Sequence, residues 1–218
     1  MSLGDIVGVL IVYLYVGFLL YIFEFRSNED LFLRRKLIHI MVGNIVFILP
    51  LFDTRWVMVG LAAAPFIILT FLISPLFSIG LNSETSNSGH GLGLFYYSIS
   101  WTILAFLFFE DLGIIAVGII CMSYGDGMAS LIGRRFGKHR FNLTGDEKSF
   151  EGSVAMIFFS FGMSIIALFY LDAVPERILI LPLVVLIATL VEILSVRGLD
   201  NLLVALSSSI TYYILLNL

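Results

Sequence analysis

The chain has 218 residues, of which 60% are hydrophobic and 13% are charged, and its mean hydropathy is +1.05. Soluble domains are about 45–50% apolar and about 25% charged, and a fold of this length leaves too much surface in water to hide so many apolar side chains. These figures exclude a soluble globular protein and a disordered chain. The net charge of -4 gives no support to nucleic-acid binding, and the lone cysteine, Cys121, excludes an intramolecular disulfide framework or a cysteine-based zinc site. We expect one all-α membrane domain over residues 1–218, with Cys121 as a small core residue.

Runs of apolar residues predict a bundle of about eight transmembrane helices, because a helix needs about 20 apolar residues to cross the hydrocarbon. The second and eighth runs are short, so either could form an interfacial or half-buried helix instead. The runs are Leu3–Phe25, Leu37–Phe52, Trp56–Ile79, Leu92–Phe109, Leu112–Ile132, Gly152–Leu171, Ile178–Leu194 and Leu202–Leu216.

The basic residues predict the orientation of this bundle, because cytoplasmic loops carry an excess of Lys and Arg. With eight spans, only Arg55 and Arg177 fall on one side, and the other ten basic residues fall on the opposite side. We expect that second side to be cytoplasmic and both termini to be non-cytoplasmic. The ten residues are Arg26, Arg34, Arg35, Lys36, Arg134, Arg135, Lys138, Arg140, Lys148 and Arg197.

The polar residues gather on the same side as the basic ones. Among the predicted loops, those on this side hold nearly all the Gly, Ser and Asn, including the stretch 82–91 with His90, which we interpret as a flexible lid. A transporter is expected to place polar groups near the membrane midplane instead. The pattern favours a reaction at the cytoplasmic interface that joins a water-soluble reagent to a lipid.

The densest polar stretch begins at Gly125 and Asp126, inside an apolar run. An acidic side chain there costs at least about 2.5–3.5 kcal/mol on insertion scales. Asp126 is therefore expected either to bind a divalent cation, for which a carboxylate is a suitable ligand, or to pair with a neighbouring basic residue. If the helix continues past Ile132, Gly133 and Gly137 share a face with Asp126, although small residues at this spacing more often indicate helix packing.

Residues 133–151 are predicted to form a cytoplasmic nucleotide-binding loop. Lys138 and Lys148 lie in it, and Ser149 can cap the helix that follows, with Glu151 and Gly152 in the first turn. A helix N-terminus beside a lysine is a natural phosphate site, and plain helix capping is the alternative. The stretch lacks the spacing of a Walker loop.

Two further clusters carry candidate residues. Arg35, Lys36 and His39 can share one helix face, which at the end of a span favours an anion-binding role. Glu192 lies inside an apolar run and must be paired, protonated or solvated. It is followed by Asp200 and Asn201, either of which could merely cap the last helix. Carboxylates with Lys and Arg suit phosphoryl chemistry, in which Mg2+ and the cations neutralise the transferring group.

Four motifs in order resemble those of the CTP-dependent polyprenol kinase family, which includes dolichol, phytol and farnesol kinases and the CTP-dependent diacylglycerol kinase. The resemblance covers roughly residue 35 to the C-terminus. The motifs are Arg35-Lys36-x-x-His39, Gly125-Asp126-x-x-Ala129-x-x-x-Gly133-x-x-x-Gly137-Lys138, Lys148-Ser149-x-Glu151-Gly152-Ser153 and Glu192-x-x-Ser195-x-x-Gly198-x-Asp200-Asn201-Leu202.

This resemblance implies an integral membrane enzyme that moves the terminal phosphate of CTP to a lipid alcohol, with a divalent cation such as Mg2+. The membrane is that of a prokaryotic cell or of the eukaryotic endoplasmic reticulum, with the active site facing the cytoplasm. Asp126, Lys148, Glu192 and His39 are the candidate catalytic residues, and Asp126 and Asp200 are the candidate metal ligands. The candidate nucleotide-binding residues are Arg35, Lys36, Gly125, Gly133, Gly137, Lys138, Ser149, Glu151, Gly152 and Asn201.

Two other functions remain open from the sequence. Some of these motifs are also similar to those of phosphatidate cytidylyltransferases, which transfer CMP to a lipid phosphate. A non-enzymatic lipid transporter is the second alternative. The residues identify neither the lipid alcohol, nor a group that reads the nucleobase, nor the general base, nor the oligomeric state.

Overall fold

The computed structural model describes residues 1–27, 30–72, 74, 92–144, 146–196 and 198–218, and most of them are helical, as predicted. The predicted cytoplasmic residue Arg197 and the predicted lid with His90 lie outside the described residues. The α-helices are α1 (Leu3–Tyr21), α2 (Leu31–Val42), α3 (Arg55–Val57), α4 (Ala64–Leu72), α6 (Gly93–Leu107), α7 (Leu112–Ile120), α8 (Gly127–Phe136), α9 (Phe150–Tyr170), α10 (Ile180–Leu194) and α11 (Asp200–Leu216).

Short irregular helical segments connect several of these helices. Ile22–Arg26, Met58–Ala63 and Cys121–Asp126 are π-helical, and Gly43–Phe47 and Leu49–Leu51 are 3-10 helices. Two strands, β1 (Arg140–Asn142) and β2 (Glu147–Ser149), pair antiparallel with Arg140 opposite Ser149. The predicted loop 133–151 therefore contains the last turn of α8 and a small hairpin.

Among the described residues, four continuous helical stretches are long and apolar enough to cross a membrane: Leu3–Tyr21, Arg55–Leu72, Leu112–Phe136 and Phe150–Tyr170. The shorter apolar helices α6, α10 and α11 coincide with three more of the predicted runs. The remaining run, residues 37–52, holds the end of α2 and both 3-10 segments instead of one long helix. The count of eight spans and the side of the termini stay predictions.

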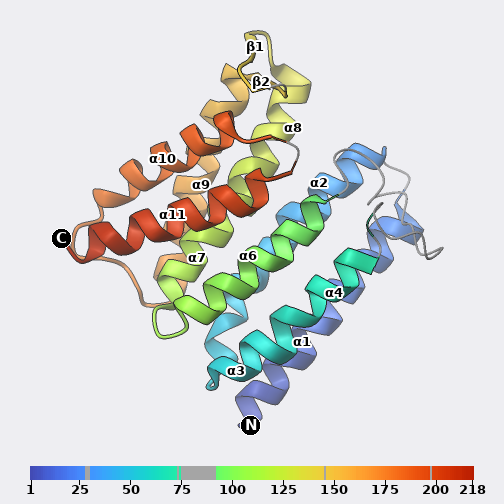
Figure 1. Ribbon diagram of the computed structural model, residues 1–218, viewed down its shortest axis with the longest axis vertical. Helices are drawn as coiled ribbons and strands as arrows, with labels where there is room; N and C mark the ends of the chain where they lie inside the picture. The colour runs from blue at the N-terminus through green and yellow to red at the C-terminus, as the bar shows by residue number, and fades with distance from the viewer. Residues whose placement is uncertain (28–29, 73, 75–91, 145, 197) are drawn as a thin grey trace.

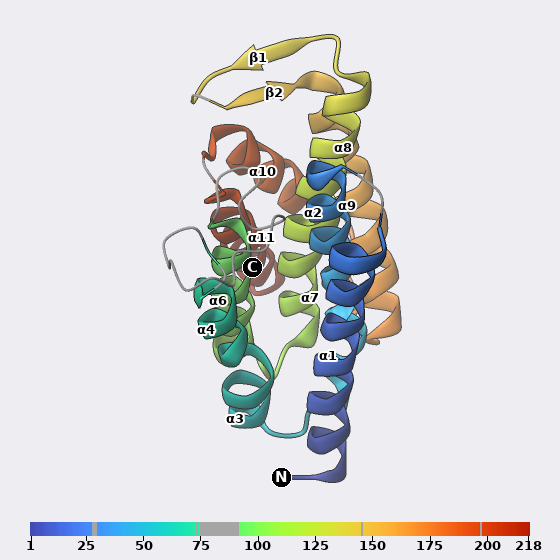
Figure 2. The ribbon, with the colours of Figure 1, turned by 90° about the vertical axis from the view of Figure 1, so that its right-hand side faces the viewer.

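The stretch from α7 to α8 lies at the centre of the bundle (Figures 1 and 2), and 83% of its most apolar 18-residue segment is buried. Every residue of Gly113–Ile120 is buried, which suits a helix that is apolar on all sides. Helices α9, α6 and α11 contact it. The buried thiol of Cys121 follows directly, so its predicted place in the core is confirmed.

The hairpin and the N-terminus lie at opposite ends of the molecule (Figure 2). At the N-terminal end the carboxylate of Asp5 has no exposed surface and accepts hydrogen bonds from four donors. The backbone N–H groups of Ser2, Asp53 and Thr54 donate at 2.9, 3.0 and 3.0 Å, and the Thr54 hydroxyl donates at 2.8 Å. Asp5 therefore fastens the start of α1 to the segment before α3.

We expect Asp5→Ala to lower the thermal unfolding midpoint in detergent by several degrees, because it removes the acceptor of these four part-buried hydrogen bonds. Asp111→Ala removes an exposed carboxylate near the same end and serves as the control. Equal midpoints for the two variants would contradict this role.

Candidate active site

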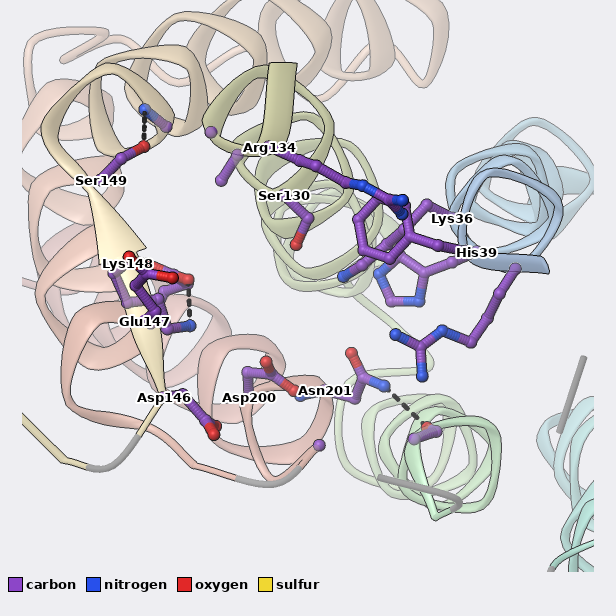
Figure 3. A pocket seen from close by; sticks show the side chains of 18 of the residues that line it. Lys36, His39, Ser130, Arg134, Asp146, Glu147, Lys148, Ser149, Asp200 and Asn201 are labelled. Carbon is purple, nitrogen blue, oxygen red and sulfur yellow. Dashed lines mark hydrogen bonds and ion pairs between the residues drawn. The ribbon is translucent and has the colours of Figure 1, made fainter. Parts of the chain in front are cut away.

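A pocket of about 380 Å3 lies beneath the hairpin, and Figure 3 shows the side chains that face it. Helix α2 contributes one wall, β2 and the start of α9 contribute the opposite wall, and α8 lies between them. The end of α10 and the starts of α6 and α11 complete the pocket. Segments more than 150 residues apart in the sequence therefore meet at one site, for example Lys36 and Asn201.

Arg35, Lys36 and His39 all line the pocket from α2, so their predicted common face is confirmed. The Lys36 ammonium donates to Oδ2 of Asp126 at 2.8 Å. His39 is buried, and its Nε2 lies 2.9 Å from the Met122 carbonyl oxygen and 3.4 Å from the same Oδ2. Burial lowers the pKa of Arg35. The Asp126 and Asp200 carboxylates oppose this shift, because they favour the charged form of the guanidinium.

Asp126 lies behind Lys36 and His39 and does not itself line the pocket. It ends the π-helical segment Cys121–Asp126, and π-helical turns occur often at functional sites. The ion pair that the sequence left as an alternative is therefore present. Oδ1 of Asp126 is buried and has no hydrogen-bond partner among the described residues. Its role as a metal ligand stays a prediction.

Glycines bring α8 and α9 close together along one wall. A Cβ atom on Gly152 would lie 2.7 Å from the Ala129 carbonyl oxygen, and one on Gly133 would lie 2.9 Å from Ser149 Oγ. Both glycines line the pocket, whereas Gly125 and Gly137 do not. Gly125 instead packs on Ser160, where a Cβ would come within 2.2 Å of Oγ. These four glycines therefore serve helix packing, and of the four only Gly133 and Gly152 also border the pocket.

We expect Gly152→Ala to destabilise the protein by about 1–3 kcal/mol, because the added methyl group forces α9 away from α8, and to reduce activity at least as strongly as stability. Gly162→Ala is the matched control on the same helix, since a Cβ there meets no atom within 4 Å. The control should be neutral or stabilising, because alanine is the better helix former. Thermal unfolding and enzymatic activity would be measured for both, and similar behaviour of the two variants would contradict the prediction.

Ser149 caps α9, as predicted, and its Oγ accepts from the Gly152 N–H at 3.1 Å. Glu151 points away from the pocket and holds the hairpin: one oxygen lies 2.7 Å from His139 Nδ1, and both lie 3.3 Å from the His139 N–H. Neither Glu151 nor Lys138 lines the pocket. Ser149 therefore lies at the wall, while Glu151 acts on the shape of the hairpin.

Lys148 and Glu192 form an ion pair at the wall opposite α2, with 15% and 4% of their side chains exposed. Burial alone would lower the pKa of Lys148, but the carboxylates of Glu192 and Asp126 raise it above its ordinary value. Lys148 is therefore charged at neutral pH, and its stabilising effect would be lost only as the pH rises through this raised pKa. The requirement that Glu192 be paired, protonated or solvated is met by pairing.

Asp200 and Asn201 line the pocket from the first turn of α11, and Leu199 takes the N-cap position. The Asn201 amide donates to the Gly93 carbonyl at 2.7 Å, which fixes which end of the amide is oxygen. Its Oδ1 is buried and has no hydrogen-bond partner among the described residues. The plain capping alternative therefore does not describe Asn201.

The oxygen atoms at the pocket can be compared with what the predicted Mg2+ requires. The part of the chain that the structure describes has no group of three His, Cys, Asp or Glu side chains able to hold a metal ion. Mg2+, however, is commonly held by one or two carboxylates together with substrate phosphates and water. Asp200 in the wall and the unpartnered oxygens of Asp126 and Asn201 fit that arrangement, in which the nucleotide supplies the other ligands.

Ten of the fifteen predicted site residues line this pocket, and some lining residues were not predicted. Ser130 lines the pocket, and so do Arg134 and Arg140, which had been predicted only as basic residues of the cytoplasmic side. Asp146 and Glu147 also face it (Figure 3). The predicted residues in the wall are Arg35, Lys36, His39, Gly133, Lys148, Ser149, Gly152, Glu192, Asp200 and Asn201, and those outside it are Gly125, Asp126, Gly137, Lys138 and Glu151.

Comparison with known proteins identifies the family. No family model matches the chain, and no solved structure matches it. The chain is 35% identical to a phytol kinase of Synechocystis over 183 residues, which cover 81% of this chain and 76% of that protein. The chain belongs to the polyprenol kinase family. The family predicted from the four motifs is thus confirmed.

Two further relatives match over smaller parts of this chain. A farnesol kinase of Arabidopsis thaliana is 33% identical, over 66% of this chain and 50% of the relative. A dolichol kinase of Schizosaccharomyces pombe is 46% identical over 55 residues, which are 25% of this chain and 10% of the relative. The chain therefore spans about half the length of the farnesol kinase and a larger share of the phytol kinase.

Proposed function

We propose that this chain is a kinase that transfers the terminal phosphate of CTP to the hydroxyl group of a prenol-type lipid alcohol at the cytoplasmic face of its membrane. The observation that carries the proposal is a pocket with five cationic side chains at one end of an apolar helical bundle, in a member of the polyprenol kinase family. The relatives are named for phytol, farnesol and dolichol, which are all isoprenoid alcohols. The choice of CTP rests on the family resemblance of the motifs.

The cationic side chains of the pocket are proposed to bind the triphosphate of the nucleotide. Lys36 and Arg35 face it from α2, and Lys148 faces it from β2; Arg134 and Arg140 add charge at the hairpin side. The start of α9 presents backbone N–H groups beside Lys148, which favours an anion. Positioning and charge neutralisation are the main requirements of phosphoryl transfer. A bound Mg2+ would supply further neutralisation, with Asp200, Asn201 and Asp126 as the nearby oxygen donors.

In the proposed reaction the alcohol oxygen forms a bond to the terminal phosphorus. The bond from that phosphorus to the bridging oxygen breaks, and CDP leaves. The hydroxyl proton passes to a carboxylate of the pocket and then to water. Both Glu192 and Asp126 accept a hydrogen bond from a lysine. Glu192 is the proposed acceptor, because it lines the pocket, whereas Asp126 lies behind the wall.

The test is a panel of lipid alcohols crossed with the four nucleoside triphosphates, each labelled at the α or the γ position. Purified protein in detergent or liposomes should move γ-label from CTP into phytol, farnesol or a longer prenol. Lipid labelled only from the α position would replace the proposal by cytidylyl transfer. Movement of lipid across liposomes without nucleotide consumption would replace it by transport.

A further inference from the structure

A second hollow, of about 460 Å3, lies between α9 and α10 and is lined entirely by apolar side chains. The two helices contact each other. The α9 residues follow helical spacing along one stripe, so the hollow is a groove along the helix axis. Its lining residues are Val154, Ile157, Phe158 and Phe161 from α9 and Pro182, Val185 and Leu186 from α10.

The groove is open to the surroundings of the bundle. Phe158 is 72% exposed, and Val154 and Leu186 are 49% and 47% exposed. Phe150–Tyr170, which includes α9, is one of the stretches long and apolar enough to cross a membrane, so this opening faces hydrocarbon when the protein is embedded. A lipid chain can therefore enter sideways, and any length beyond the groove can stay in the bilayer.

The same two helices carry the groove to the polar pocket. On α9, Ser153 lines the pocket and its neighbour Val154 lines the groove. On α10, Glu192 lies seven residues after Val185, which is two helical turns on the same face and about 10 Å along the axis. The Lys148–Glu192 ion pair links the segment before α9 to α10, so it lies at the polar end of the groove between these two helices.

We propose that the isoprenoid chain of the acceptor alcohol lies in this α9–α10 groove, with its hydroxyl group entering the polar pocket beside Lys148 and Glu192. This inference rests on the proposed function. A lipid alcohol must bring its hydroxyl group to a charged site while its chain stays out of water. A groove whose polar end is a carboxylate paired with a lysine provides both environments along one line.

The lipid surroundings of the groove determine the expected effects of substitutions in it. Lipid tails are as apolar as the groove, so the hydrophobic effect contributes little to binding from the membrane, and close packing must supply the selectivity. Removing a methyl group from the groove should therefore change little. Filling the groove with a larger side chain should exclude the acceptor chain directly, which makes added bulk the sharper test.

The test compares Leu186→Trp with Leu183→Trp. Both residues lie on α10 and are 47% exposed, but Leu183 does not line the groove. Leu186→Trp should raise the KM for farnesol and longer prenols by about tenfold, a change of about 1.4 kcal/mol, and leave the KM for CTP unchanged. Leu183→Trp should change neither constant. A five-carbon prenol, too short to fill the groove, should be phosphorylated equally by both variants.

A second measurement uses the wild-type protein, so that it does not depend on the folding of a variant. A prenol that carries a diazirine in its chain should crosslink to peptides of α9 and α10, in competition with unlabelled prenol. If wild type phosphorylates prenols but the two tryptophan variants share one acceptor KM and crosslinks fall on other helices, the groove assignment is overturned and the proposed kinase stands. If wild type phosphorylates no lipid alcohol, the proposed function itself fails.

Discussion

Glu192→Gln is expected to lower kcat for lipid phosphorylation by about 100-fold or more, since general-base catalysis contributes about 100- to 10,000-fold. The substitution keeps the shape of the side chain and removes its capacity to take the hydroxyl proton. It also leaves the Lys148 ammonium in the pocket wall without its nearest carboxylate. The measurement is kcat with saturating nucleotide and prenol, for protein that elutes as the wild type does in detergent.

A double-mutant cycle separates the two effects of this change. Removing one partner of a buried ion pair destabilises a protein by about 3–5 kcal/mol, whereas replacing both partners is often nearly neutral. Lys148→Met with Glu192→Gln should therefore recover much of the stability lost in either single variant, but none of the activity. Recovery of activity together with stability would show that the pair acts only on the fold.

The pH profile gives a third readout for Glu192. A carboxylate base predicts that kcat falls as the pH is lowered and the carboxylate is protonated, and that this acid limb is absent from the residual activity of Glu192→Gln. Glu110→Gln is the control, because Glu110 is 76% exposed and pairs with Arg55 away from the pocket. An unaltered kcat and acid limb in Glu192→Gln would contradict the assignment and leave Asp200 as the carboxylate to test.

The features that depend on local sequence were predictable. The apolar composition indicates a helical membrane domain, and Ser149 as an N-cap and the common face of Arg35, Lys36 and His39 follow from spacing within a few residues. The structure agrees on the helical content, with four stretches long and apolar enough to span a membrane among the described residues, and on the N-cap and the common face. The helix also continues past Ile132, to Phe136, which is the condition under which Gly133 shares a face with Asp126.

The features that depend on distant residues were not predictable in the same way. The pairing of Lys148 with Glu192 joins residues 44 apart, and no spacing rule connects them. The hairpin consists of strands of three residues, too short for an alternating pattern to indicate. Arg140, the first residue of β1, lines the pocket, whereas Lys138, which precedes the strand, does not. The position of Arg140 and Lys138 in the same run of basic residues therefore does not indicate which of the two lines the pocket.

Asp126→Asn is expected to reduce turnover by at least about 100-fold and leave the protein inserted in the membrane. The carboxylate holds both the Lys36 ammonium and the His39 ring from behind the pocket wall. With a neutral amide in its place, Lys36 loses the charge that orients it, and Coulomb attraction is strong where solvent is scarce. The control is Asp111→Asn, whose exposed carboxylate lies outside the pocket.

Two roles of Asp126 give different results in the same variant. If its unpartnered Oδ1 binds Mg2+, Asp126→Asn should need a higher Mg2+ concentration for half-maximal activity and weaken Mn2+ binding measured by electron paramagnetic resonance in the presence of nucleotide. If Asp126 only positions Lys36 and His39, the metal dependence should stay as in wild type, and Lys36→Met should lose activity to the same degree. Turnover equal to wild type would contradict both roles. The Asp126 carboxylate, which is 1% exposed and pairs with two pocket residues, would then be needed neither to bind Mg2+ nor to position Lys36 and His39.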